Sequence, residues 1–210
     1  YSGTIWTNQM QRTDSQPKAE MLDEIGRWTM TNDGVKMLGA LGFENTYAFA
    51  VRPDDARQKS LQTLDDLARV SSDFNFGTDV EFLERPEWRM VQDAYPIRFK
   101  DARSFSPTFM YPALASGEVD VISAFSSDGR IAANNFVILE DNKGAVPSYE
   151  AILLLSPKRA NEDRFVSALK PLIGAITVEN MREANYTVDR EGDKKTPREA
   201  ALWLNDKLRE

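Results

Sequence analysis

The sequence contains no cysteine and no histidine among its 210 residues. Without thiols it forms no disulfide, iron–sulfur cluster or thiolate zinc site. Without imidazole it lacks the side chain that most readily titrates near neutral pH and most often binds transition metals. Any catalysis would depend on carboxylates, hydroxyls, lysine or tyrosine. We therefore expect neither a metal nor a cofactor.

An excess of positive charge and a long apolar run are also missing. Acidic side chains number 33 against 26 basic ones, for a net charge of −7, so a nucleic acid or anionic membrane surface would be repelled, and we expect no such partner. The longest aliphatic run, Ala151 to Leu155, is far below the roughly 20 residues of a membrane-spanning helix. The opening Tyr1 to Thr4 lacks the basic and apolar regions of a signal peptide, so we expect the sequence to begin inside a longer polypeptide.

What is present is an ordinary globular composition, with 41% hydrophobic and 28% charged residues. Short β-like runs alternate with helical patterns along the chain, which predicts an α/β fold. The helical spacing of apolar residues in 18–30 predicts a helix, and a second apolar stripe at 35–41 is interpreted as its helical continuation after a turn. Strands are predicted at 46–52, 74–77, 119–125, 136–139 and 151–155, and further helices after Thr63, at 86–94, from Ser106 to Gly117, after Pro157, through Met181 and at 196–208.

The sequence carries none of the common enzyme motifs. It has no glycine-rich phosphate loop, calcium loop or nucleophilic serine elbow. The adjacent acids Asp54-Asp55 and Asp65-Asp66 are interpreted as helix-dipole partners, because acidic pairs at a helix start more often have that role. We therefore expect that the chain is not an enzyme. An enzyme that uses Asp79, Glu81 or Asp128 stays open as an alternative.

Three segments, 42–48, 124–131 and 139–151, and the opening Tyr1-Ser2-Gly3-Thr4 resemble one known family. They are similar to the osmoprotectant-binding proteins of ABC importers, which capture glycine betaine, choline or carnitine in the interlobe cleft of a two-lobed type II periplasmic-binding fold. The resemblance implies one lobe from 1–44 plus 149–210, a second from 45–148, and a hinge near Asn45 and Tyr149. It also implies that the first lobe lacks upstream β/α units.

The resemblance also implies a binding site. A quaternary ammonium group donates no strong hydrogen bond, so selective capture depends on aromatic π faces. The residues that match the family's aromatic cage are Tyr1, Tyr47, Phe125 and Tyr149, and those that match its contacts to the ligand's polar end are Thr4 and Arg85. Because a guanidinium binds a carboxylate with two parallel hydrogen bonds, Arg85 favours a betaine over choline.

Several alternatives follow from departures within this pattern. Phe125 stands where many relatives have tyrosine, and some relatives bind ergothioneine, so another betaine is an alternative ligand. By composition alone, Tyr47 and Phe125 would be predicted as core residues. The same fold could serve a ligand sensor. It could also be a structural remnant whose incomplete first lobe no longer binds anything, or one that completes this lobe by exchange with a second chain or by dimerisation.

The resemblance further implies partners and a location. The expected partner is an ABC permease, either a separate subunit or a fused transmembrane domain, because similar sequences with Arg-Pro-Glu-Trp, here Arg85 to Trp88, often follow a permease segment. The expected location is the periplasm or the extracytoplasmic face of a bacterial membrane.

Overall fold

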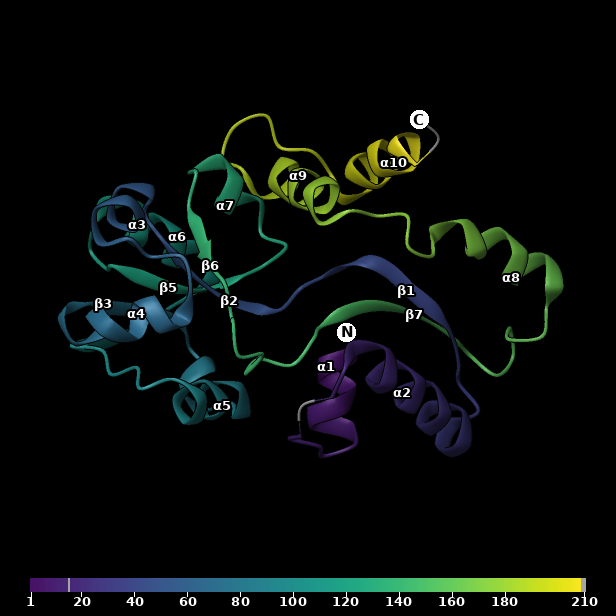
Figure 1. The fold of residues 1–210 in the computed structure, drawn as a ribbon. Coiled ribbons are helices and arrows are strands. Elements are labelled where there is room, and N and C mark those ends of the chain that lie inside the picture. Colours follow the sequence, from purple (N-terminus) through teal and green to yellow (C-terminus); the bar gives the residue numbers. More distant parts are fainter. Residues whose placement is uncertain (15, 209–210) are drawn as a thin grey trace. The chain divides into compact units, whose positions relative to one another are not determined.

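The computed structural model describes residues 1–14 and 16–208. The chain divides into two compact units, one from Tyr1–Thr46 together with the chain from Pro147 onward, and the other from Tyr47–Val146 (Figure 1). Each unit combines strands with helices, which confirms the predicted α/β class. Within the described residues no helix is both long and apolar enough to cross a membrane.

The first unit is built on an antiparallel pair of strands, β1(Lys36–Glu44) and β7(Glu150–Leu155). Apolar side chains cover the pair in two clusters, one around Trp6 and Ile25 and the other around Phe43 and Ile176. The other elements of this unit are α1(Ser2–Thr4), the π-helical turn η1(Ile5–Gln9), α2(Lys18–Asp33), α8(Asp163–Leu169), η4(Lys170–Leu172), α9(Val178–Asp189) and α10(Pro197–Lys207).

The helical interpretation of residues 35–41 is wrong, because this segment lies in β1. Met37 packs into the cluster around Trp6, whereas Leu41 packs into the cluster around Phe43. A strand with apolar residues on both faces, and with register shifts between them, lacks the clean alternation that identifies a strand. Gly39 and Gly42, at φ of 153° and 112°, were the available signal, since each glycine costs a helix interior about 1 kcal/mol relative to alanine.

The second unit contains a five-stranded sheet in the order β4-β3-β5-β2-β6. Its strands are β2(Tyr47–Val51), β3(Asn75–Asp79), β4(Asp101–Phe105), β5(Val121–Phe125) and β6(Val137–Leu139). Strand β3 is parallel to β4 and β5, whereas β2 is antiparallel to β5 and β6. The strand predicted at 119–125 is β5, which lies in the middle of the sheet, parallel to β3 and antiparallel to β2.

Two helices of this unit begin or end at the residues whose sequence signals predict a helix boundary. Thr63 caps α4(Leu64–Val70): its hydroxyl accepts a hydrogen bond from the Asp66 amide at 3.2 Å, and the Asp66 carboxylate accepts one from the Thr63 amide at 3.0 Å. Gly117, at φ 80°, ends α6(Pro107–Ser116) in the left-handed conformation. The remaining elements are α3(Pro53–Lys59), η2(Ser71–Asp73), η3(Phe82–Glu84), α5(Pro86–Ala94) and α7(Gly129–Ala133).

Candidate ligand-binding site

Three strand ends bring candidate residues to one edge of the sheet in the second unit. Tyr47 begins β2 and is the register partner of Phe125, which ends β5. Asp79 ends β3, which runs parallel to β5. The carboxyl ends of parallel strands are where open α/β sheets bind ligands. The sheet therefore gathers Tyr47, Phe125 and Asp79 at an edge suited to binding.

The aromatic rings at this edge touch one another. The Tyr47 ring centroid lies 5.2 Å from that of Phe125 and 4.6 Å from that of Phe82, both in tilted arrangements. Phe82 is fully buried, whereas Tyr47 and Phe125 are half-buried. Aromatic pairs at these separations attract each other, and their exposed faces can contact a cation. Phe82, the first residue of η3, lies in none of the matched motifs, so the sequence did not indicate it as a site residue.

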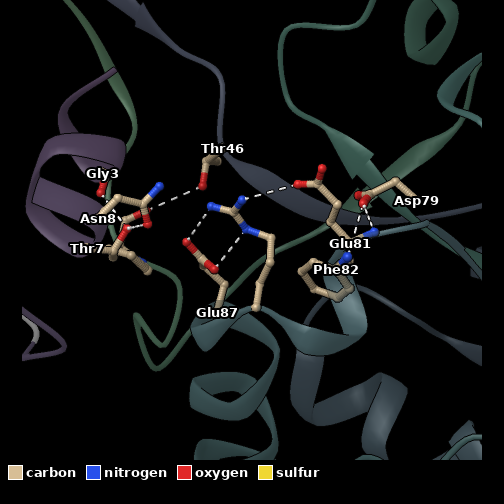
Figure 2. Close-up of polar contacts among 10 residues, drawn as sticks. Gly3, Thr7, Asn8, Thr46, Asp79, Glu81, Phe82 and Glu87 are labelled. Atoms are coloured by element: carbon tan, nitrogen blue, oxygen red, sulfur yellow. Dashed lines mark hydrogen bonds and ion pairs between the residues drawn. The ribbon is translucent and has the colours of Figure 1, made fainter. Parts of the chain in front are cut away.

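Arg85 lies over the Tyr47 ring, with its guanidinium carbon 5.4 Å from the ring centroid. Its fork, however, is bound by Glu87: Nε donates to Oε2 at 3.1 Å and Nη2 donates to Oε1 at 3.2 Å (Figure 2). Nη1 also lies 3.8 Å from the Glu81 carboxylate. The bidentate geometry that the sequence predicts for a ligand carboxylate is thus present, but with the fully buried Glu87 as its partner.

The Asp79 carboxylate is buried beside Tyr47. Its Oδ1 accepts hydrogen bonds from the backbone amides of Glu81 at 2.8 Å and Phe82 at 3.0 Å (Figure 2). In the described part of the chain, no group donates a hydrogen bond to the buried Oδ2. Burial, and next the negative charge of Asp79, raise the pKa of the Tyr47 phenol, while the positive charge of Arg85 opposes this shift.

In the first unit, the opening motif packs against the start of β7. The Ser2 hydroxyl donates to the Ser148 carbonyl at 3.0 Å and accepts from the Glu150 amide at 2.9 Å. Gly3 lies so close to Tyr149 that a Cβ on it would clash with ring atom Cε2. Each residue of the pair Ser2-Gly3 therefore has a structural role: one supplies hydrogen bonds, and the other lets the backbone approach an aromatic ring.

The three candidate residues of this unit differ in exposure. Tyr149 is 5% exposed, Tyr1 is 47% exposed, and Thr4 at the end of α1 is half-buried. Burial raises the pKa of the Tyr1 phenol, and a hydrogen bond with the Asn45 side chain acts in the opposite direction. The first unit thus brings Tyr149 against the opening motif, and Tyr1 to Asn45.

A charged group lies beside Tyr149. Glu44 and Glu150 face each other across β1 and β7, and Lys18 bridges them, with its ammonium 3.0 Å from Glu44 and also paired with Glu150. Burial raises the pKa of Glu150, against the effect of Lys18. Burial alone would also raise the pKa of Glu44, but its hydrogen bond and charge interaction with Lys18 lower it overall. The two acids are therefore kept together by one lysine.

Comparison with known proteins identifies the family. Residues 5–206 match the model described as the substrate-binding domain of ABC-type glycine betaine transport systems. The chain belongs to this family. The membership confirms the resemblance that the sequence motifs indicated.

Two curated relatives illustrate the range of the family. An ergothioneine transport permease/ergothioneine binding protein, EgtU, of Helicobacter pylori is 28% identical over 99% of this chain and 37% of its own length. The carnitine transport binding protein OpuCC of Listeria monocytogenes is 33% identical over 70% of this chain and 49% of its own length. This chain thus spans between about a third and a half of these relatives.

Solved structures confirm the two-lobed type II periplasmic-binding fold. The crystal structure of a glycine betaine/carnitine/choline ABC transporter protein superimposes with a TM-score of 0.89 at 26% identity, covering 100% of this chain and 77% of that one. Apo YehZ from Escherichia coli matches with a TM-score of 0.75 at 20% identity, covering 99% of this chain and 78% of that one. The second match supports the fold alone.

The close packing of Gly3 predicts a mutational effect. In Gly3→Ala, the new methyl group forces the Tyr149 ring out of its position, so we expect a lower affinity for ligand, by roughly tenfold, if one aromatic contact is lost. Calorimetric titration measures the change in ligand affinity, and thermal unfolding measures any change in stability separately. Gly192→Ala is the matched control, because a Cβ there meets nothing within 4 Å. Wild-type affinity in Gly3→Ala would show that the position of Tyr149 does not matter for binding.

The lysine bridge predicts a pH-dependent stability difference. Lys18→Met leaves Glu44 and Glu150 facing each other without their shared cation, so we expect a loss of about 1 kcal/mol at pH 7. The loss of Lys18 raises the pKa of both carboxyls in the folded state, and the resulting destabilisation is full above these raised pKa values and is lost as the pH falls through them. The pKa of Glu150 lies above its ordinary value even with Lys18 present, so the difference from wild type should shrink as the pH falls through that raised pKa and should disappear once both carboxyls are protonated. Urea unfolding at pH 7 and pH 4 measures it, and a constant difference would contradict the prediction.

Proposed function

We propose that this chain is the substrate-binding component of an ABC importer and binds a small quaternary ammonium solute of the glycine betaine, carnitine or choline type. The observation that carries the proposal is the aromatic pair Tyr47 and Phe125 at the ligand-binding edge of the sheet, in a chain of the glycine betaine substrate-binding family. Each half-buried ring offers a π face, and such a face contributes about 0.5–2 kcal/mol to the binding of a desolvated cation.

We extend the proposal to Tyr1, Thr4 and Tyr149 of the first unit as further ligand contacts. Their support is the matched motif at 1–4 and the packing of Tyr149 against it. Arg85 stays part of the proposal as a cation over the Tyr47 ring. A ligand bound by these residues would shift the chain toward the conformation that it binds most tightly, and only to the extent of that difference in affinity.

The proposal includes the partner and the location. The partner is an ABC permease, and the chain works on the extracytoplasmic side of a bacterial membrane. Support for a fused permease comes from the Helicobacter relative, which is named as both permease and binding protein. The ligand would be released unchanged, as transport requires. Recovery of chemically intact ligand after prolonged incubation tests this part, and any turnover would contradict it.

Ergothioneine is the second candidate ligand. The observation that favours it is the match to the ergothioneine binding protein of Helicobacter pylori over 99% of this chain. Ergothioneine is itself a betaine, so the same aromatic faces could bind its trimethylammonium group. The two candidate ligands differ in the rest of the molecule, because ergothioneine carries a thioimidazole ring in addition to its trimethylammonium group.

A calorimetric titration of the chain with glycine betaine, choline, carnitine and ergothioneine tests the proposal. We expect saturable binding of at least one of the four at a single site. The matched controls are glycine and ethanolamine, which have a primary ammonium in place of the trimethylammonium group. They should not bind, because they lack the group that the aromatic faces recognise. If none of the four ligands shows measurable binding, the proposed function is wrong.

A further inference from the structure

The sheet edge that carries Tyr47 and Phe125 is rich in negative charge. Asp79, Glu81 and Glu87 contribute three carboxylates, and Arg85, which pairs with two of them, contributes one positive charge. Arg130, beyond the end of β5, is already paired with Asp128 and adds no net charge. Among the described residues, no group of three or more acids is arranged to hold a metal ion. The net negative charge of this edge favours a ligand with a positive charge.

Asp79 is the carboxylate that has capacity to bind. It is 5% exposed, its Oδ1 holds two backbone amides, and within the described residues its buried Oδ2 accepts no hydrogen bond. A buried carboxylate oxygen without a donor is unfavourable, and a ligand that supplies an O–H or N–H would relieve that cost. Asp79 is also close enough to Tyr47 for its charge to act on the phenol, so it lies beside the proposed aromatic contact.

The Arg85–Glu87 pair also affects which ligand charge this edge can bind. Two of the guanidinium's donors are directed at Glu87, whose carboxylate is fully buried. A ligand carboxylate that approached Arg85 would have to compete with this pair and would meet three negative groups. The edge thus opposes an anionic ligand end, contrary to the preference for a betaine that Arg85 alone predicts.

We propose that this edge selects, among quaternary ammonium solutes, a net cation with a hydrogen-bond donor, an amino alcohol of the choline type, over a zwitterionic betaine, and that Asp79 is the specificity-determining residue. The inference rests on the proposed function, since it concerns the ligand of the same site. The donor is bound by Oδ2, and the quaternary ammonium group by the neighbouring rings.

Four probes separate charge from hydrogen bonding in a calorimetric titration of the wild-type chain. Choline is a cation with a donor, tetramethylammonium is a cation without one, carnitine is a zwitterion with a donor, and glycine betaine is a zwitterion without one. We expect choline to bind most tightly and glycine betaine most weakly, with at least a tenfold difference. If glycine betaine binds as tightly as choline, the inference is wrong. If none of the four binds, the proposed function fails instead.

The variant Asp79→Asn tests the residue itself. The amide keeps an acceptor for the backbone amides of Glu81 and Phe82 but loses the charge, so choline affinity should fall at least tenfold and the preference over glycine betaine should disappear. Asp54→Asn is the matched control, because that carboxylate is 73% exposed at the start of α3 and is not part of this edge, so its neutralisation should change affinity less than twofold. An equal loss for all ligands in Asp79→Asn would overturn the assignment. Should the variant fail to fold, the wild-type ligand order still decides the charge preference.

Discussion

Replacing Tyr47 with alanine is expected to lower the affinity for a quaternary ammonium ligand by about thirtyfold or more. The aromatic face lost is worth about 2 kcal/mol when the cation is desolvated, and 1.4 kcal/mol corresponds to a factor of ten. The ring also packs against Phe82 and Phe125, so its removal frees the remaining rings to move. Calorimetric titration with the tightest ligand of the panel measures the loss.

Tyr47→Phe is the control for this result, because it keeps the ring and removes only the hydroxyl. It should bind quaternary ammonium ligands within a few fold of wild type. Thermal unfolding of both variants separates a lost contact from a lost fold. Unchanged affinity in a folded Tyr47→Ala variant would mean that Tyr47 is a core residue, as its apolar strand alone suggests.

Arg85→Ala is expected to destabilise the chain by about 3 kcal/mol, because it removes the guanidinium from a fully buried carboxylate. Glu87 is 0% exposed, and its two oxygens accept from Nε and Nη2 of Arg85. Removal of one partner leaves the charge of the other poorly compensated in a medium of low dielectric constant. Urea unfolding measures the change in the free energy of unfolding.

The double variant Arg85→Met/Glu87→Leu is the informative comparison. It removes both charges and retains the apolar volume, so most of the lost stability should return, since buried pairs can often be replaced in this way at little cost. The opposite pattern would be an Arg85→Ala variant as stable as wild type that no longer binds ligand. It would show that Arg85 serves the ligand directly, as the sequence predicts, and that the pair with Glu87 is secondary.

Much of the fold could be predicted because its signals are local. Thr63, Ser106-Pro107 and Gly117 mark helix ends through the chemistry of single residues, and the structure places helix boundaries at each of them. β1 was misassigned because its apolar residues face both sides of the strand pair. Strand β4 was missed because its residues are largely exposed, and polar exposed strands carry no hydrophobic periodicity.

In the candidate site, too, some features could be read from the sequence and others depended on the tertiary structure. By resemblance, the sequence alone indicated the family, the quaternary ammonium ligand class and the residues Tyr47, Phe125 and Arg85, because motifs that follow chain order are preserved in the sequence itself. Only the tertiary structure decided what those residues touch. Strand register brings Tyr47 to Phe125, across almost eighty residues of chain.

The burial of Asp79 and Glu87 was likewise a tertiary result. Both look like ordinary surface acids in sequence, one after a strand and one in the first turn of a helix, yet the fold leaves them 5% and 0% exposed. Whether a carboxylate is solvated depends on which distant segments cover it, and no local pattern encodes that. For this reason the sequence determined by resemblance only that Arg85 matches a family contact to the ligand's polar end, and the packing determined that this arginine is bound by a buried glutamate.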